Sequence, residues 1–472
     1  MVVPKIAVCP ICNNRIYLRI QDGSYLNSYP IRISCLKCHA IIKGVYRMTT
    51  SSGTSGLHLF NAQIEECDVV PTNNNTVIVQ NADCVAEVSG ELPCKKVKYY
   101  DKFYHSKNYS TPFMDATKQT NMMQIMENLR SFVKNQREWH AWKSISFQLL
   151  SEGSFDYLPI ALNNKMGNYE YPCDNNLKSF QCLQAIVLEQ TKMIFWDTSQ
   201  EKYIGDLIKH ISAIDDFQLH SLVKRIGGIS TVILAFQKNM DLFCSFMEIY
   251  PHILPAITYM TYKEKDNSDI GLSTCSFFDV KSFYQDAYES LLSTLYIPVS
   301  IDNILTRNNY DDYNSTFSSL FVKKRYANLS DNLERYQALD NGMKAENICN
   351  EIVQNALNIP AKRLLRNAIG HNNYKYDNAK QIITFFDVKH GAISISLLEM
   401  AKDCIGLAKS SVIMSEVLLF IMRHELRNEG IHSIIPMQFY NDNQPNDKCP
   451  CGSNIKYKKC CKFEVDRLKN NI

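Results

Sequence analysis

Two groups of closely spaced cysteines constrain what this 472-residue chain can fold into. The first group reads C-x2-C twice and comprises Cys9, Cys12, Cys35 and Cys38, and the second reads C-x-C-x8-C-C and comprises Cys449, Cys451, Cys460 and Cys461. Four thiolates bind Zn²⁺ as a tetrahedron with Zn–S distances of about 2.3 Å, and each close pair supplies two sulfurs from one tight turn. The sequence therefore predicts two structural zinc sites, one near each end of the chain.

The stretch between the first two pairs alternates polar and apolar side chains, as strands do, at 15–20 and again at 31–33. Two cysteine turns joined by a hairpin form a zinc ribbon, which this stretch resembles, and we expect the loop at 22–30 to protrude. His39 follows Cys38 and is an alternative ligand. The competing interpretation is two accidental C-x2-C pairs, and a redox role is less consistent with a duplicated pair.

The C-terminal cysteines closely resemble the SEC-C zinc motif, which is appended to many bacterial proteins. Pro450, Gly452 and the Lys-Tyr-Lys run that begins at Lys456 also fit that pattern. Cys461 stands where the family has His or Cys, and Asn454 replaces a common glycine, which asparagine can do because it tolerates positive φ. The resemblance implies a fold too small to bury a core, so metal binding and folding should be one event.

A basic run overlaps this motif. Five lysines and no acid occur between positions 448 and 462, namely Lys448, Lys456, Lys458, Lys459 and Lys462. One interpretation is contact with phosphate or with an acidic protein surface. The other is a solvated basic face on a small module, so the run indicates a partner only weakly.

The composition is that of a globular protein, with 45% hydrophobic and 21% charged residues, and 17 glycines and 15 prolines favour helices. A length of this order suggests about three domains. The apolar segment 397–422 is interrupted by Lys402, Asp403, Lys409 and Glu416, and no signal peptide precedes Cys9, so we expect a cytoplasmic protein without a membrane span. The nine remaining cysteines are then small buried hydrophobes in a reducing compartment.

The chain between the zinc sites divides by pattern. Turn signals and a strand at 76–80 extend a β-rich region to about residue 100, and a basic, aromatic link covers 95–109. Helical stripes begin near 119 and recur at 177–195, 203–224 and 229–248. No glycine-rich phosphate loop or nucleophile elbow occurs, and His424-Glu425 is no zincin motif because Asn428 stands where the second histidine belongs.

A last helical region covers about 275–432. A helix is expected at 345–357, a second from Pro360 to near Gly370, a hairpin with strands at 381–386 and 392–396, and a long helix at 396–422. The second helix carries Arg366, Asn367 and His371 in an R-x4-H pattern. With the flanking helix and hairpin and the continuation at 372–377, this resembles the HEPN superfamily, particularly members associated with abortive infection.

The resemblance implies a helical bundle that cleaves RNA without a metal, from R-x4-6-H motifs that meet across a dimer interface. The chemistry suits these residues, because RNA supplies its own 2′-hydroxyl nucleophile. His371 is able to transfer protons near neutral pH, Arg366 to stabilise the charge developing on the phosphate, and Asn367 to orient one of these groups. The alternative is that the R-x4-H residues have no catalytic role and are only a helix cap and a surface charge.

These observations combine into one expected architecture. We predict a mainly α protein with a zinc ribbon at 1–50, a β-rich extension and linker at 51–118, a helical domain at 119–274, a HEPN-like bundle at 275–440 and a SEC-C zinc module at 446–466. The leading hypothesis is a homodimeric endoribonuclease, a toxin or antiphage effector acting on transfer RNA or other cellular RNA. The rival is a non-catalytic adaptor that binds RNA, protein or ribosomes through its zinc modules. A third interpretation is an enzyme in the helical middle without a readable motif.

Overall fold

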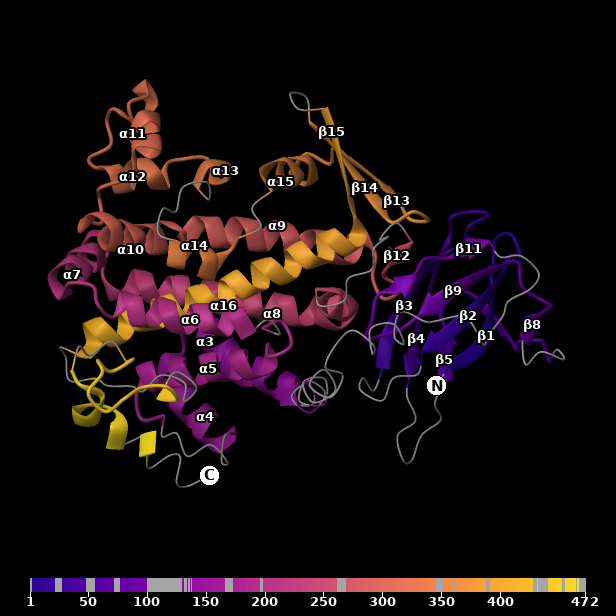
Figure 1. The fold of residues 1–472 in the computed structure, drawn as a ribbon, viewed down its shortest axis with the longest axis horizontal. Helices are drawn as coiled ribbons and strands as arrows, with labels where there is room; N and C mark the ends of the chain where they lie inside the picture. The colour runs from indigo at the N-terminus through magenta and orange to yellow at the C-terminus, as the bar shows by residue number, and fades with distance from the viewer. Residues whose placement is uncertain are drawn as a thin grey trace. The chain divides into compact units, whose positions relative to one another are not determined.

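A computed structural model describes most of the chain (Figure 1). The described residues are 2–21, 28–47, 56–71, 77–99, 130, 134, 136, 138–165, 173–195, 198–260, 269–344, 351–359, 362–387, 391–427, 431, 440–451, 455–463 and 465–466. Several expectations lie outside them: the first helical stripe at 122–132 apart from position 130, residues 22–27 of the loop expected at 22–30, the start of the helix at 345, Pro360, and the φ of Asn454. The last three residues of that expected loop belong instead to the strand Ser28–Ser34.

The protein is mainly helical, with small β-sheets in its N-terminal part. The strands are β1 Val2–Val8, β2 Arg15–Gln21, β3 Ser28–Ser34, β4 Ile41–Arg47, β5 Gly56–Leu59, β6 Gln63–Glu65, β7 Val69–Pro71, β8 Val77–Val79, β9 Cys84–Val88, β10 Cys94–Lys95, β11 Lys98–Tyr99, β12 Ile270–Gly271, β13 Tyr374–Asp377, β14 Ile382–Asp387 and β15 Gly391–Ser396. The helices are η1 Lys143–Phe147, α3 Gln148–Ser151, η2 Phe155–Tyr157, α4 Leu158–Lys165, α5 Asn176–Gln190, α6 Thr198–Ile211, α7 Asp216–Arg225, α8 Ile229–Tyr259, α9 Phe277–Thr294, α10 Tyr296–Arg307, α11 Ser315–Phe321, η3 Lys324–Tyr326, α12 Asn332–Gln337, α13 Asn341–Lys344, α14 Glu351–Leu357, α15 Arg363–Gly370, α16 Leu397–Arg427 and η6 Tyr457–Lys459.

The chain forms two compact units, each assembled from three separate segments. Unit 1 comprises Met1–Lys134, Phe246–Gln285 and Arg363–Ile405, and unit 2 comprises Asn135–Ser245, Asp286–Lys362 and Gly406–Ile472. The long helices α8, α9 and α16 are therefore each divided between the units.

Unit 1 is built on two N-terminal hairpins. β1 and β2 pair antiparallel, and β2 also pairs parallel with β9, within a five-stranded sheet of order β11-β9-β2-β1-β6. β3 pairs with β4, and β5 completes a separate three-stranded sheet. The expected hairpin between 15–20 and 31–33 is therefore wrong: each cysteine turn reverses its own pair of strands, and both edges of β2 are occupied by β1 and β9.

A further sheet of unit 1, with three strands, follows α15. β14 pairs antiparallel with β13 on one side and β15 on the other, and α15 lies beside β14 (Figure 1). The ring of Phe277 packs against Tyr374, Tyr376 and Phe385, with ring centroids 4.9, 5.7 and 6.2 Å away. The expected hairpin is confirmed, and β13 is an additional strand that periodicity did not reveal.

Unit 2 is helical. α5 begins where Asn175 accepts a hydrogen bond from the Lys178 N–H, and it ends at Gln190, so the stripe expected to 195 is shorter as a helix. The stripe at 203–224 is two helices, because the side chain of Asp215 caps a new helix by accepting bonds from two N–H groups of its first turn. Trp139 packs against Phe147 and Phe243 with centroid separations of 5.2 and 5.3 Å, which places aromatic side chains in the core.

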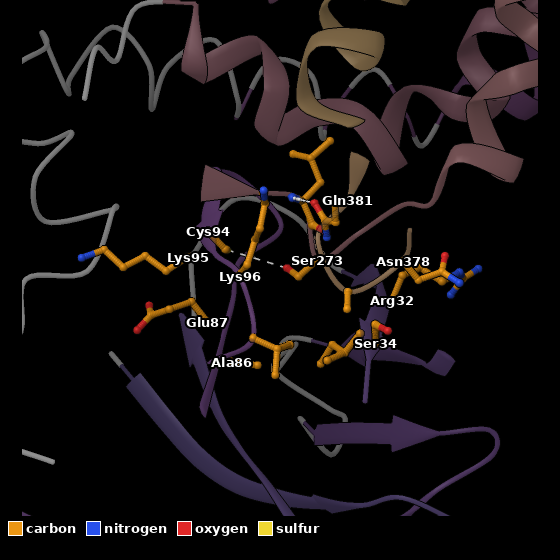
Figure 2. Close-up of a pocket in the computed structure, with 15 residues that line it drawn as sticks. Arg32, Ser34, Ala86, Glu87, Cys94, Lys95, Lys96, Ser273, Asn378 and Gln381 are labelled. Carbon is orange, nitrogen blue, oxygen red and sulfur yellow. Dashed lines mark hydrogen bonds between the residues drawn. The ribbon is translucent and has the colours of Figure 1, made fainter. Parts of the chain in front are cut away.

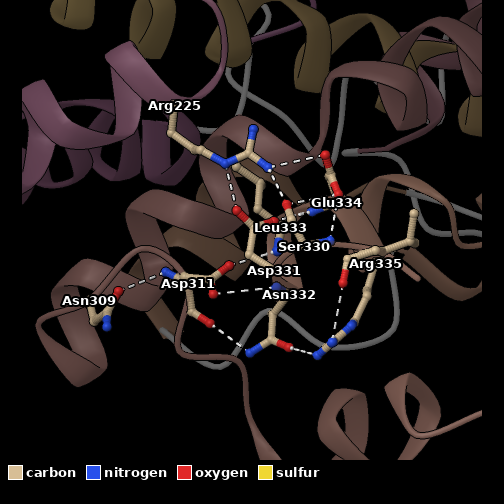
Figure 3. A network of polar contacts seen from close by, with 10 residues as sticks. Arg225, Asn309, Asp311, Ser330, Asp331, Asn332, Leu333, Glu334 and Arg335 are labelled. Atoms are coloured by element: carbon tan, nitrogen blue, oxygen red, sulfur yellow. Dashed lines mark hydrogen bonds and ion pairs between the residues drawn. The ribbon is translucent and has the colours of Figure 1, made fainter. Parts of the chain in front are cut away.

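α12 is joined to α7 within unit 2 by a polar network (Figure 3). Arg225, in the last turn of α7, lies 2.5 Å from Asp331, the residue that caps α12, and 3.4 Å from Glu334. Asp311 accepts hydrogen bonds from the N–H groups of Leu333 and Asn332, the former at 2.7 Å. The N-terminus of α12 is thus held by carboxylates, which its exposed N–H groups favour.

α16 is long and apolar enough to cross a membrane by length and composition alone, with a mean hydropathy of 1.8 over its best window. That window is 94% buried within the protein, which is also what the core helix of a soluble protein shows. α7 and α8 pass the same test only when taken together across a bend of 78°. The charged residues of 397–422 therefore do not exclude a membrane-spanning helix by composition. The burial of α16 within the protein accounts for its apolar sequence.

Candidate metal centres

Each N-terminal cysteine pair forms the turn of one hairpin. Between β1 and β2, the Cys9 N–H donates to the Asn14 carbonyl at 3.0 Å, and the Asn13 N–H donates to the Cys9 carbonyl at 3.0 Å. Asn13 has φ of 56°, a left-handed conformation that asparagine tolerates. The turn brings the sulfurs of Cys9 and Cys12 within 4.8 Å of each other.

The second pair repeats this geometry between β3 and β4. The Cys35 N–H donates to the Ala40 carbonyl and the His39 N–H to the Cys35 carbonyl, both at 2.9 Å. His39 has φ of 61° and so occupies the position of Asn13 in the first turn. It is not part of the group of side chains that converge on one point, so the expectation of His39 as an alternative ligand is not supported. Its role here is that of a turn residue.

The four N-terminal thiols converge. All four Sγ atoms lie within 4.8 Å of one another, and Cys9–Cys38 and Cys12–Cys35 are each separated by 3.5 Å. A disulfide would need about 2.05 Å. Thiolates around one Zn²⁺ at about 2.3 Å lie about 3.8 Å apart. The cluster therefore has the dimensions of a metal site and is able to bind a metal ion.

The electrostatics of this cluster favour a cation. Burial alone would raise the pKa of Cys9, but hydrogen bonds from the backbone N–H groups of Ile11 and Cys12 lower this pKa to about 7. The N–H of Ala40 would lower the pKa of Cys38, yet burial and contacts with the other thiols raise it to about 12. One thiolate thus forms readily and opposes the ionisation of its neighbours. A divalent ion removes that opposition.

The C-terminal cysteines form a second cluster, with all four Sγ atoms within 4.8 Å of one another. Cys460 lies 3.5 Å from Cys451 and 3.7 Å from Cys461, again too far for a disulfide. The Cys449 N–H donates to the Ile455 carbonyl at 2.8 Å, which closes the loop between the two halves of the motif. This cluster is also able to bind a metal ion.

Little else holds the C-terminal module together. Its other buried side chains in the described residues are Tyr440, Tyr457 and Val465, and the two tyrosine rings stack at 5.5 Å. A core of this size cannot offset the conformational entropy of the segment, so metal binding should supply most of its stability.

The basic run surrounds this module. Lys448, Lys456, Lys458 and Lys459 are exposed, whereas Lys462 forms an ion pair with Asp466. Four of the five lysines are thus exposed to solvent. Their exposure fits both expected interpretations, a docking face and a solvated face.

The Arg366–His371 segment lies at the C-terminal end of α15, in unit 1. α15 ends at Gly370, as expected, although the left-handed residue that terminates it is Asn372, with φ of 56°. Arg366 Nη1 donates to Asn367 Oδ1 at 3.1 Å, and both side chains are partly buried. His371 is exposed just beyond the helix, so its imidazole faces solvent. These side chains line neither cysteine cluster.

Comparison with known families identifies one part of the chain. Residues 446–462 match the SEC-C motif, so the chain carries a SEC-C motif at its C-terminus. No HEPN family matches. No curated protein and no solved structure matches the chain.

Proposed function

We propose that this protein is a cytoplasmic, homodimeric endoribonuclease of HEPN type, with two structural zinc ions and an active site formed by Arg366, Asn367 and His371. Its biological role would be that of a toxin or antiphage effector acting on transfer RNA or other cellular RNA. The observation that carries the proposal is that a partly buried arginine, bonded to Asn367, and an exposed histidine lie within six residues at the C-terminal end of one helix. The helix–sheet–helix setting of α15, β13–β15 and α16 adds support.

The proposed chemistry assigns each residue a task. The 2′-hydroxyl of RNA attacks the adjacent phosphorus, the bond to the 5′-oxygen breaks, and the products are a 2′,3′-cyclic phosphate and a free 5′-hydroxyl. His371, exposed to solvent, would transfer the protons that move in this step. Arg366 would bind the phosphate oxygens as their negative charge increases, and its bond to Asn367 fixes the guanidinium before RNA arrives.

The surroundings of His371 suit a single-stranded substrate. Phe386 of β14 donates its backbone N–H to the Asn373 carbonyl at 2.9 Å, which brings an aromatic residue close to the end of α15. The Phe386 side chain is 47% exposed. Exposed aromatic rings stack unpaired bases without sequence preference. A base held there would place its neighbouring phosphate near the Arg366–His371 pair.

Zinc is proposed for both clusters because four thiolates suit a soft, tetrahedral ion. The proposal is tested by metal analysis of the purified protein. Two equivalents of zinc for each chain are expected, and one equivalent after Cys12→Ser or Cys460→Ser. Iron in place of zinc, or unchanged zinc in either variant, would contradict the assignment.

The nuclease is tested with zinc-loaded protein, total RNA and transfer RNA. Cleavage with cyclic-phosphate ends is expected for the wild type and is expected to disappear in Arg366→Ala and His371→Ala. Lys380→Ala, at an exposed lysine of the β13–β14 turn, serves as a matched control. Cleavage that rises more steeply than linearly with protein concentration would support the dimeric site. Toxicity and RNA cleavage that are the same in His371→Ala as in the wild type would refute catalysis.

A second function, that of a non-catalytic adaptor, is favoured by the SEC-C motif and its exposed lysines. In this case Cys460→Ser, or glutamines at Lys456, Lys458 and Lys459, would abolish binding to ribosomes, RNA or protein, whereas His371→Ala would have no effect. The two functions therefore predict opposite results for His371 and for the C-terminal module.

A further inference from the structure

A small polar cleft in unit 1 is formed by five separate parts of the chain, one of which is β9 with Ala86 and Glu87 (Figure 2). β3 contributes Arg32 and Ser34, the chain around β10 contributes Lys95 and Lys96, the segment after β12 contributes Ser273, and the β13–β14 turn contributes Asn378. Figure 2 shows Arg32 and Asn378 together at one side of the cleft, with Ser34 near them, and Lys96 at the other side. None of these residues belongs to a cysteine cluster or to the Arg366–His371 segment.

Three buried polar atoms of this cleft have no hydrogen-bond partner among the described residues: Nε of Arg32, Oγ of Ser34 and Oδ1 of Asn378. A buried polar atom without a partner costs about 1–3 kcal/mol. Native proteins rarely leave several such atoms together. Three unpartnered polar atoms among the residues of one cleft therefore indicate that the cleft binds a ligand.

Arg32 is held in place although its Nε–H is unused. Its Nη1 donates to the Ile31 carbonyl at 2.9 Å, and its Nε lies 3.8 Å from Asp279, too far for a hydrogen bond. Asp279 instead accepts bonds from the N–H and hydroxyl of Ser276, at 2.7 and 2.8 Å. The guanidinium is therefore oriented before a ligand arrives and retains a free donor.

The charges lining the cleft favour an anion. Arg32, Lys95 and Lys96 are the cations, and Glu87 is the only acid among the lining residues. Glu87 is buried and accepts a hydrogen bond from Arg19 at 3.0 Å, so its charge is already balanced. Burial lowers the pKa of Lys96, against the opposing effect of Asp269 and Asp377. A bound anion would favour the charged form of this lysine.

We propose that this cleft binds a phosphate group, either as free phosphate or as the terminal phosphate of a nucleic acid. Arg32 Nε–H and the Ser34 hydroxyl donate to its oxygens, and Lys96 supplies charge. Asn378 donates through Nδ2 once its amide is turned, an orientation that hydrogen bonding decides. Donors from several directions suit a tetrahedral oxyanion better than a planar carboxylate. This proposal does not depend on ribonuclease activity.

Isothermal titration of the full-length, zinc-loaded protein with inorganic phosphate tests the site. Ser34→Ala and Arg32→Gln should each weaken phosphate binding about 10-fold or more, since each removes a hydrogen bond to a charged group. Arg47→Gln, at an exposed arginine of β4, should not change it. Because Arg32→Gln also removes the ion pair with Asp279, the Ser34→Ala result decides, and its melting temperature should equal or exceed that of the wild type.

A second arm distinguishes the two sources of phosphate. A 5′-phosphorylated RNA oligonucleotide and its 5′-hydroxyl counterpart are compared, with inorganic phosphate as competitor. Preference for the phosphorylated oligonucleotide, lost in Ser34→Ala, identifies a terminal phosphate, and binding of inorganic phosphate alone identifies the free ion. The proposal is overturned if the wild type binds neither probe, or if Ser34→Ala binds phosphate as tightly as the wild type does. The cleft would then hold only water.

Discussion

His424 Nε2 lies 2.9 Å from Asp216 Oδ1, while its Nδ1 lies 3.2 Å from Glu425 Oε1. Both ring nitrogens of a buried histidine therefore face carboxylates, an arrangement that only the doubly protonated imidazolium satisfies as a donor. Burial alone would lower the pKa of His424, but its hydrogen bonds to Glu425 and Asp216 raise this pKa above its ordinary value. The imidazole of His220, 2.9 Å from Glu425, and the guanidinium of Arg427, 3.6 Å from Asp216, are the other side chains of the cluster.

The first prediction concerns the pH dependence of this cluster. Because the folded-state pKa of His424 is raised, its contribution is fully present below the unfolded pKa of about 6.5 and is lost as pH rises through the folded pKa. His424→Gln should lower the free energy of unfolding by about 2 kcal/mol at a pH just below 6.5, and by less in alkaline buffer. Urea unfolding across pH measures this, with His140→Gln, at an exposed histidine of unit 2 outside this cluster, as control. A pH-independent difference would contradict the charged state.

A second prediction concerns Arg225 and Asp331. Burial alone would raise the pKa of Asp331, but hydrogen bonds from Arg225 and from the Glu334 N–H hold this pKa below its ordinary value. That contribution is present above the unfolded pKa of about 3.9 and is lost as pH falls through the folded pKa. Since the pair is partly solvated, a double-mutant cycle with Arg225→Gln and Asp331→Asn should give a coupling of about 1 kcal/mol at pH 7. The coupling should vanish in acid, and a coupling that persists there would refute the ion pair.

The sequence predicted those features that depend on nearby residues. The cysteine pairs bring their sulfurs together through single tight turns, so the two metal-binding groups were predicted from spacing alone and are confirmed as clusters. α16 and the β14–β15 hairpin were likewise evident from periodicity and turn residues. The R-x4-H site stays a prediction, because its partner residues would come from a second chain.

The features that sequence missed depend on distant pairings. β2 pairs in parallel with β9, with Ile16 opposite Cys84, and no local pattern encodes that pairing. The β-rich region was expected to extend to about residue 100, but the pairing of β10 with β12, near residue 270, was not predicted. The cleft of Arg32, Ser34 and Asn378 has no sequence signal for the same reason.

The third prediction tests the β4–β5 pairing beside the second cysteine turn. A Cβ at Gly44 would lie 2.5 Å from the His58 carbonyl oxygen and 2.7 Å from Leu59 Cδ2. Gly44→Ala should therefore destabilise unit 1 by about 1–3 kcal/mol, because backbone must shift to admit the methyl group. Gly56→Ala, where a Cβ would meet nothing within 4 Å, is the control. Equal stability of the two variants by thermal unfolding would show that the strands are not paired in this register.

The fourth prediction concerns removal of metal. A strong chelator should unfold the C-terminal module, because the core of Tyr440, Tyr457 and Val465 is too small to keep it folded without the metal ion. Limited proteolysis should then cleave within 440–466 and stop when zinc is restored. Cys460→Ser should be cleaved there even with zinc present, whereas Cys67→Ser, at a half-buried cysteine outside both clusters, should resemble the wild type. Full resistance of the chelated protein would show that the module folds without metal.

The last prediction concerns Phe386 and depends on the proposed ribonuclease. Because its exposed ring lies on the strand bonded to Asn373, Phe386→Ala should weaken binding of single-stranded RNA about 5- to 100-fold, the range that loss of one stacked base gives. Phe60→Ala, at a phenylalanine of unit 1 that is 61% exposed, should leave binding unchanged. Fluorescence anisotropy with a labelled oligonucleotide measures the affinity, and Phe386→Tyr should restore it because stacking needs only the ring. Weaker binding with cleavage retained at saturating RNA would assign Phe386 to substrate binding, and equal affinity in Phe386→Ala and wild type would remove β14 from the RNA path.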